Sequence, residues 1–395
     1  MNAPIALGFG DNVDYEIAWD SAVFEALIAR YAIGAGELAA DPPIASEREL
    51  VISILRFLAS GTGGERFVAS SEVIEPFAQR FAKKITLGGT SVRAAIAMRT
   101  LGYTSALHLV TVNEHVRRLI PPDSPYVCSS AADTLYPHLI VQFDKGAHVR
   151  AGDIDITARR ANRIIYHNDT DNITMRLNEE FARLITQAQA LLISGFNAMQ
   201  REDLLLDRLA AVRRMLAALP AGACVFFEDA AFYNPRFSTL IQQALADTIT
   251  VYSLNEDELQ AHAGRPVDVL DAAQVEAALA SLHRLIPAPI LVVHSMHWAL
   301  AYGPTAPRYR PALAGGVTMA TTRFCHGDDF TAREYSAVAA LPPTADGARF
   351  AAAITQRLGD RVCCVPVAHV EQSKATTVGL GDAFVGGFLA ALVGA

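Results

Sequence analysis

Short apolar runs alternate with amphipathic segments along most of the chain. The runs have the length of buried strands, and the longer segments between them repeat apolar residues at helical spacing. Strands that alternate with helices favour a parallel sheet covered on both faces, so the pattern predicts an α/β fold. The expected strands are 4–10, 85–89, 190–194, 223–227, 248–252, 289–294 and 361–366. The clearest expected helices are 21–38, 46–58 and 92–101.

The pattern changes between residues 103 and 167. Four short β-like runs alternate with turns there, at 106–112, 138–143, 153–157 and 163–167. The chain has 395 residues, more than one compact core usually holds, so a second and smaller unit is expected. We expect a β-rich lid from 21–59 and 103–187, and a large α/β domain from 1–20, 60–102 and 188–395.

Composition narrows the class of protein. Hydrophobic residues make up 51% and charged residues 19%, which is typical of a globular chain. The net charge of -8 disfavours nucleic acid and anionic membranes as partners. No basic signal peptide opens the sequence, and the longest apolar run, 383–395, is shorter than the ~20 residues that span a bilayer. Five scattered cysteines without a Cys-x-x-Cys pair predict reduced thiols in a cytoplasmic protein. The sequence does not indicate the oligomeric state.

The strongest chemical motif is Gly379-Leu380-Gly381-Asp382, which precedes a run of small and apolar residues with helical potential. The glycines let the backbone approach a ligand, and the start of a helix offers free N–H groups to an anion. Asp382 would accept a hydroxyl proton during phosphoryl transfer. The alternative is a helix N-cap that follows a glycine turn.

Acids also follow two of the apolar runs. Glu228 comes directly after Val225 to Phe227, and Glu258 follows Asn255 at the start of a predicted helix. Open α/β sheets bind ligands at the carboxyl ends of their strands, and Mg²⁺ prefers one or two carboxylates plus waters. We therefore predict that Glu228 and Glu258 hold Mg²⁺, or another divalent cation, in one crevice with Asp382. The alternative is that acids in a first helical turn only complement the helix dipole.

A fourth polar site follows the first strand. Asn12 and Asp14 supply an amide and a carboxylate, which suit bidentate hydrogen bonds to sugar hydroxyls, and Gly88-Gly89-Thr90 ends a later strand. The alternative is a turn rich in Asx residues. The sequences typical of P-loop kinases, protein kinases and α/β hydrolases are absent.

Taken in order, these motifs resemble those of the ADP-dependent glucokinases and phosphofructokinases, within the ribokinase-like superfamily. Asn12-Val13-Asp14 is similar to the family's Asn-x-Asp, and Gly379 to Asp382 is similar to its Gly-x-Gly-Asp. Asn255 and Glu258 fit its Asn-x-x-Glu. Asn162-Arg163-Ile164-Ile165 is similar to its Asn-Arg-Phe-Ile.

Two positions depart from the family pattern. Thr90 replaces the Asn of a Gly-Gly-Asn segment, and Phe226 replaces the His of the His-x-Glu that ends in Glu228. These departures keep open a catalytically weak sugar- or nucleotide-binding homologue. An ATP-dependent ribokinase-like kinase of a sugar or nucleoside is a further alternative.

The resemblance implies a ribokinase-like, Rossmann-type three-layer large domain, a smaller β-rich lid, Mg²⁺, and a role in carbohydrate metabolism such as glycolysis. It implies phosphoryl transfer from ADP to a hexose or hexose phosphate, namely glucose or fructose 6-phosphate, giving AMP. The implied catalytic residues are Asp382 and the backbone of Gly379, Leu380 and Gly381. The implied substrate-binding residues are Asn12, Asp14, Gly88, Gly89, Thr90, Asn162 and Arg163. The implied nucleotide-binding residues are Asn255, His294 and Val378.

The sugar stays open on the sequence. A sugar phosphate needs cations, for which Arg163, Lys145, Arg159 and Arg160 are candidates. A free hexose favours an additional acid in the lid. Glu65 and Arg93 are candidates that the sequence alone does not place.

Overall fold

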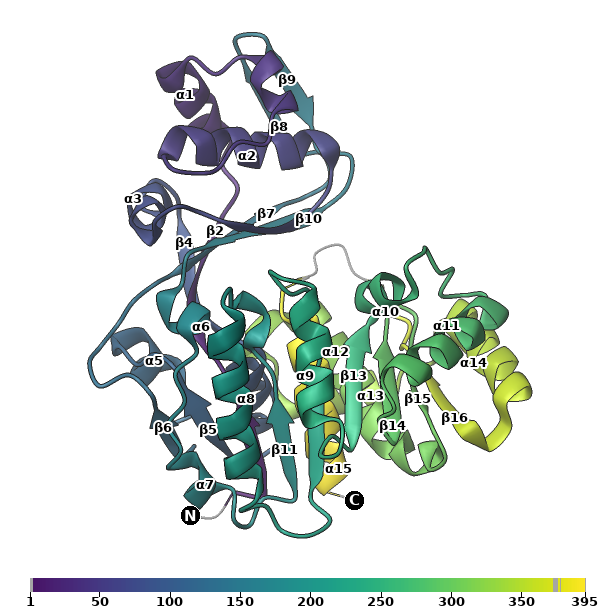
Figure 1. The fold of residues 1–395 in the computed structure, drawn as a ribbon. Coiled ribbons are helices and arrows are strands. Elements are labelled where there is room, and N and C mark those ends of the chain that lie inside the picture. The colour runs from purple at the N-terminus through teal and green to yellow at the C-terminus, as the bar shows by residue number, and fades with distance from the viewer. Residues whose placement is uncertain (1–2, 372–375, 377, 395) are drawn as a thin grey trace.

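The computed structural model describes residues 3–371, 376 and 378–394. A nine-stranded sheet forms the base of the molecule, below a smaller unit (Figure 1). Its strands in spatial order are β16 (Val362–Pro366), β15 (Trp298–Tyr302), β14 (Ile290–His294), β13 (Val251–Asn255), β12 (Cys224–Glu228), β11 (Ala190–Ile193), β1 (Ile5–Gly8), β5 (Ser105–Leu109) and β6 (Tyr126–Cys128). The strands from β14 to β6 pair in parallel, while β15 runs antiparallel to both of its neighbours.

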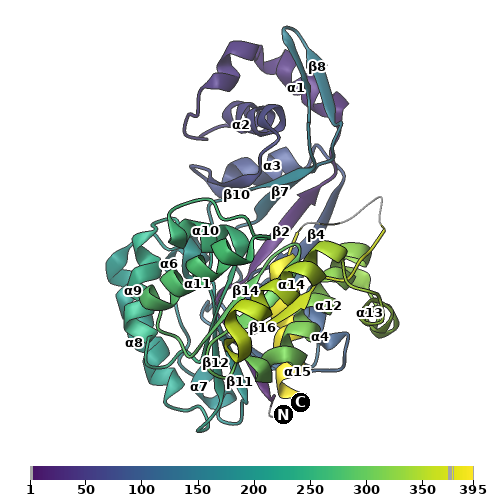
Figure 2. The ribbon, with the colours of Figure 1, turned by 90° about the vertical axis from the view of Figure 1, so that its right-hand side faces the viewer.

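Helices cover both faces of this sheet, as Figure 2 shows from the side. Successive strand residues point to opposite faces, so Phe226 of β12 packs into one core and Phe227 into the other. One layer contains α4 (Thr90–Arg99), α12 (Arg310–His326) and α15 (Leu380–Val393). The other contains α8 (Glu202–Leu216), α9 (Arg236–Leu245), α10 (Glu256–Ala263), α11 (Ala272–Leu285) and α14 (Ala345–Leu358).

The smaller unit is built on a five-stranded sheet whose two faces have different neighbours. In spatial order the sheet contains β3 (Gly64–Phe67), β10 (Asn162–His167), β7 (His138–Phe143), β2 (Asn12–Ile17) and β4 (Lys83–Gly88). Its outer face carries α1 (Ser21–Tyr31), α2 (Glu47–Ser60), α3 (Ile74–Ala78) and the hairpin of β8 (His148–Ala151) and β9 (Ile154–Thr157) (Figure 1). The opposite face looks toward the nine-stranded sheet, so the unit is positioned as a lid.

Sheet membership corrects two expectations from the sequence. Residues 103–187 were assigned to the lid, but β5 and β6 pair within the nine-stranded sheet. Every residue of β5 is buried, as a central strand requires. The segments 12–17 and 83–88 were assigned to the large domain, but they form β2 and β4 of the lid sheet. Asn12 and Asp14 therefore lie in a strand and not in an Asx turn.

Glycines bring α12 and α15 unusually close together. A Cβ added to Gly387 of α15 would lie 2.3 Å from the backbone oxygen of Gly315 in α12. A Cβ on Gly386 would lie 2.9 Å from the carbonyl oxygen of Ala94 in α4. Since α15 is held by backbone-to-backbone contact on two sides, the position of its first turn is fixed by the layer around it.

Two further expectations concern the cysteines and membranes. All five cysteines are free thiols, and the adjacent Cys363 and Cys364 are buried in β16. Within the described ranges, no helix combines the length and the apolar character needed to cross a bilayer.

Candidate active site

A cleft of about 780 Å³ separates the lid sheet from the carboxyl ends of the large sheet's strands. It collects side chains from both units, although these are far apart in the sequence. Of the catalytic, substrate-binding, nucleotide-binding and metal-binding residues that the resemblance implied, all but Asn162 line it: Asn12, Asp14, Gly88, Gly89, Thr90, Arg163, Glu228, Asn255, Glu258, His294, Val378, Gly379, Leu380, Gly381 and Asp382. The predicted convergence of strand ends on one crevice is thus present in the structure.

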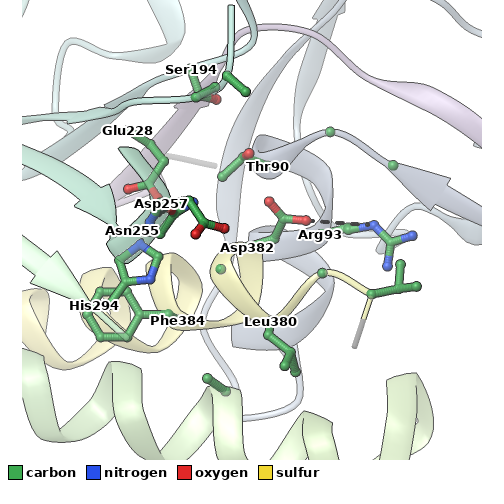
Figure 3. Close-up of a pocket in the computed structure, with 18 of the residues that line it drawn as sticks. Thr90, Arg93, Ser194, Glu228, Asn255, Asp257, His294, Leu380, Asp382 and Phe384 are labelled. Atoms are coloured by element: carbon green, nitrogen blue, oxygen red, sulfur yellow. Dashed lines mark hydrogen bonds and ion pairs between the residues drawn. The ribbon is translucent and has the colours of Figure 1, made fainter. Parts of the chain in front are cut away.

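The first turn of α15 forms the floor of the cleft. Gly379 caps the helix in the left-handed region, with φ of 66°, and Arg323 donates a hydrogen bond of 2.8 Å from Nε to the carbonyl of Val378. A Cβ at Gly379 would lie 2.9 Å from Arg93 Nη1, so only glycine fits here. Asp382 stands in this first turn and faces the cleft (Figure 3). The first N–H groups of a helix have no partner within that helix, so a helix start of this kind can bind an anion.

Arg93 of α4 lies beside this turn and is 5% exposed. Its Nη2 donates a hydrogen bond of 2.6 Å to Oδ2 of Asp14, and its Nε lies 3.8 Å from Oδ2 of Asp382. Figure 3 shows Asp382 between Arg93 on one side and Glu228 with His294 on the other. The sequence indicates that Arg93 needs a partner of opposite charge, because it lies among small and apolar residues of a predicted helix and a buried charge must be paired.

The lid contributes Asn12 and Asp14 from β2. Asn12 pairs with Gly88 across the antiparallel β2–β4 ladder, and a Cβ on Gly88 would lie 2.4 Å from Asn12 Nδ2. Asn12 Nδ2 donates a hydrogen bond of 2.6 Å to Asp14 Oδ1. The glycine therefore makes room for a polar pair that faces the cleft.

Two histidines in the lid wall were missed by the sequence reasoning. Nε2 of His167 lies 2.9 Å from Oε1 of Glu65, and Nε2 of His138 lies 3.3 Å from Oδ2 of Asp169. The two imidazoles stack with ring centroids 4.6 Å apart. Burial would lower the pKa of His138, but Asp169 raises it; burial would raise the pKa of Glu65, but His167 lowers it. Polar residues at strand ends were the available signal.

Glu228 and Glu258 meet at the opposite end of the cleft. Burial, and then the charge of Glu228, raises the pKa of Glu258 to about 8. Nε2 of His294 lies 3.0 Å from Oε1 of Glu228, while the buried Oε2 of Glu228 has no hydrogen-bond partner among the described residues. A carboxylate pair that repels itself and keeps an unused oxygen fits a hard divalent cation.

Protein side chains alone do not enclose such a cation. No cluster of three or more His, Cys, Asp or Glu side chains with the spacing of metal ligands occurs in the part of the chain that the structure describes.

Several predicted residues have local structural partners. Asn255 caps α10, where its Oδ1 accepts hydrogen bonds from the backbone of Asp257 and Glu258. Asn162 lies outside the cleft, contrary to expectation, because its Nδ2 donates to the carbonyl of Gly61 and its Oδ1 accepts from the backbone N–H of Arg163. Phe226 fills a core position 5.1 Å from the ring of Phe388.

The candidate cations for a sugar phosphate separate clearly. Lys145, Arg159 and Arg160 are exposed and do not line the cleft. Arg163 lines it, and its guanidinium forms no hydrogen bond or ion pair with any described residue. Among the described residues, the whole guanidinium of Arg163 is thus without a partner, and it lies at the cleft.

Comparisons with known proteins follow this geometry. The model of the ADP-specific Phosphofructokinase/Glucokinase conserved region matches residues 3–391. No curated protein sequence gave a match. A hypothetical ADP-dependent phosphofructokinase from Pyrococcus horikoshii OT3 superposes with a TM-score of 0.74 at 17% identity, covering 99% of this chain and 98% of that one.

Two other solved structures are similar. An ADP-dependent kinase in complex with fructose-6-phosphate and ADPbetaS gives a TM-score of 0.72 at 14% identity, covering 98% of this chain and 93% of that one. The adenosine kinase from Sinorhizobium meliloti gives 0.52 at 11% identity, covering 100% and 88%. These likenesses confirm the predicted fold class, a three-layer α/β domain of ribokinase-like type with a lid.

The family match extends over nearly the whole chain and includes both the lid and the first turn of α15. The chain belongs to the ADP-specific phosphofructokinase/glucokinase family, a family of sugar kinases.

Proposed function

We propose that this protein transfers a phosphoryl group from ADP to a hydroxyl of a hexose or hexose phosphate, giving AMP. One observation carries the proposal. Asp382 stands at an anion-binding helix start, in the same cleft as the lid's Asn12 and Asp14 and the acids Glu228 and Glu258. The cleft therefore contains a base, groups for a sugar, and groups for a metal–phosphate complex.

The reaction assigns Asp382 as the general base. The acceptor hydroxyl oxygen attacks the β-phosphorus of ADP while its proton moves to the Asp382 carboxylate. The bond between the β-phosphorus and the bridging oxygen breaks, and AMP leaves with that oxygen. Backbone N–H groups of Leu380, Gly381 and Asp382 offer hydrogen bonds to the phosphoryl oxygens during transfer.

Glu228 and Glu258 would hold the divalent cation, directly or through water. Bound Mg²⁺ would neutralise phosphate charge and orient the β-phosphoryl group. Glu228 keeps its orientation through His294, although Phe226 occupies the place of the family's histidine. Since an imidazole still contacts this acid, the replacement at Phe226 gives little support to a catalytically weak homologue.

The lid would orient the sugar and exclude water. Asn12 and Asp14 suit hydrogen bonds to sugar hydroxyls, and Arg163 is free to bind either a sugar's own phosphate or the terminal phosphate of ADP. The Glu65–His167 pair lies in the same wall, and its carboxylate suits a neutral hydroxyl better than a phosphate. Excluding water matters because water competes with the sugar as acceptor.

Replacing the base tests the assignment. Asp382→Asn keeps the size of the side chain but cannot accept the proton, so turnover should fall by about 10²–10⁴-fold. Binding of ADP, measured by calorimetry, should stay near the wild-type value because the first turn of α15 is unchanged. Turnover close to that of the wild type in a folded variant would refute Asp382 as the base.

A further inference from the structure

Arg93 is a buried cation that contacts carboxylates on both sides of the proposed reaction. It is 5% exposed, as is the side chain of its partner Asp14. Nη2 lies 2.6 Å from Asp14 Oδ2 and 3.5 Å from Glu16 Oε1, and Nε lies 3.8 Å from Asp382 Oδ2. One guanidinium therefore joins the lid strand β2 to the first turn of α15.

The remaining nitrogen of this guanidinium is unused. Nη1 is buried and has no hydrogen-bond partner among the described residues. It lies beside the loop at Gly379, where any Cβ would approach it to 2.9 Å. Among the described residues this buried, charged donor is therefore unpaired, which costs free energy, and it lies beside the proposed phosphoryl site.

The charge on Arg93 is secure in this environment. Burial would lower the pKa of Arg93, but Asp14 and Asp382 raise it above its ordinary value. Polar and charged groups from several elements surround Arg93. They are Asp14 and Glu16 of β2, Thr86 of β4, Arg163 of β10, Arg323 of α12 and the neighbouring Asp328.

We propose that Arg93 is a positioning residue that holds the sugar-binding carboxylate Asp14 and the base Asp382 at a fixed separation and offsets their mutual repulsion. This inference rests on the proposed function, in which Asp14 binds the sugar and Asp382 accepts the proton of its acceptor hydroxyl. A guanidinium can hold two carboxylates at once through its planar fork, whereas an ammonium group cannot copy that geometry.

The test compares Arg93→Gln, Arg93→Lys and the control Arg99→Gln in steady-state kinetics. Arg99 is on the same helix but forms a surface ion pair with Asp123, so its variant should match the wild type. Arg93→Gln should lower kcat by about 10²-fold, because Asp382 is no longer held in place beside the acceptor. The KM for sugar should rise by about tenfold, because Asp14 loses a charged hydrogen bond.

Arg93→Lys should separate charge from geometry. The kcat should fall by about tenfold, which is less than in Arg93→Gln, because lysine keeps the charge but one ammonium cannot reach both carboxylates. A merely structural role would lower the melting temperature of either variant but leave kcat and the KM for sugar of the folded protein unchanged. That result would overturn the inference, and if Arg93→Gln does not fold, wild-type kinetics in Arg93→Lys would overturn it equally.

Turnover of the wild type separates a failure of the role of Arg93 from a failure of the proposed function. Sugar-dependent turnover in the wild type with unchanged Arg93 variants would refute the role of Arg93 and leave the function standing. Absence of turnover with every acceptor would refute the function, and the inference would fall with it.

Discussion

At the scale of single residues, the buried carboxyl of Glu258 should lower the free energy of unfolding when it is ionised. Its side chain accepts a hydrogen bond of 2.8 Å from the backbone N–H of Asn255, and its pKa is raised to about 8 by burial and by Glu228. A carboxyl with a raised pKa in the folded state binds more protons than in the unfolded state. The free energy of unfolding without metal should therefore fall as pH rises from about 4.5 to 8.

Glu258→Gln should reverse this cost and weaken the metal site. Glutamine still accepts the cap hydrogen bond but carries no charge. In EDTA the variant should melt at a higher temperature than the wild type, by a margin that grows between pH 5 and pH 8. The Mg²⁺ concentration for half-maximal turnover should rise, because an amide is a poorer ligand for a hard cation. Equal melting temperatures together with an unchanged Mg²⁺ titration would remove Glu258 from the metal site.

Local patterns placed these acids correctly but did not reveal their partners. Glu228, Glu258 and Asp382 were predictable because each follows a strand or opens a helix, where α/β sheets bind ligands. Arg93 lies about 80 positions from Asp14 and about 290 positions from Asp382 along the chain, yet it contacts both. Such pairs arise only when the sheets are assembled, so residue type and spacing alone cannot identify them.

At the scale of elements, the packing of α15 decides where the proposed base stands. Gly387 touches the backbone of α12, so even a methyl group there must push the two helices apart. Gly387→Ala should cost about 1–3 kcal/mol of stability, as overpacking does in other cores. It should also lower kcat, because Asp382 belongs to the first turn of α15 and would be displaced together with this helix.

Gly36→Ala is the matched control for this substitution. A Cβ at Gly36 meets no atom within 4 Å, so thermal unfolding and kcat should stay at wild-type values. Wild-type stability in Gly387→Ala, measured beside this control, would show that α12 and α15 are not held by glycine contact.

Most elements were predictable from periodicity, and the errors have physical causes. β7 occupies the predicted residues 138–143, whereas β13 begins at Val251, three residues later than expected. β15 was not predicted: the expected strand 289–294 corresponds to β14 alone, and only three residues separate β14 from β15. That tight antiparallel hairpin also explains why the sheet is not parallel throughout.

At the scale of the whole molecule, the chain crosses between its two units several times. β1 and β5 belong to the large sheet, while β2 and β4 between them belong to the lid. Which sheet a strand joins depends on its pairing with distant strands. The change to short β-like runs near residue 103 therefore could not locate the boundary between the large domain and the lid. Because of these crossings, residues of β2 and β4 in the lid line the same cleft as the first turn of α15.

A ring contact also links the two units across the cleft. Tyr233, in the loop between β12 and α9, packs edge-on against Phe67 of β3 with centroids 4.8 Å apart. Phe67 in turn lies 4.3 Å from the ring of His167, which lies beside Glu65. The lid wall and the large domain are thereby joined next to the proposed sugar site.

The most direct test of the account is product analysis with a panel of hexoses and hexose phosphates, Mg²⁺, and either ADP or ATP. Mass spectrometry would count AMP and phosphorylated sugar in the same reaction, with Asp382→Asn as the control. The account predicts that ADP and one class of sugar give AMP and sugar phosphate in equal amounts, and that the control gives neither. Release of AMP without sugar phosphate, faster transfer from ATP than from ADP, or no product with any acceptor would contradict it.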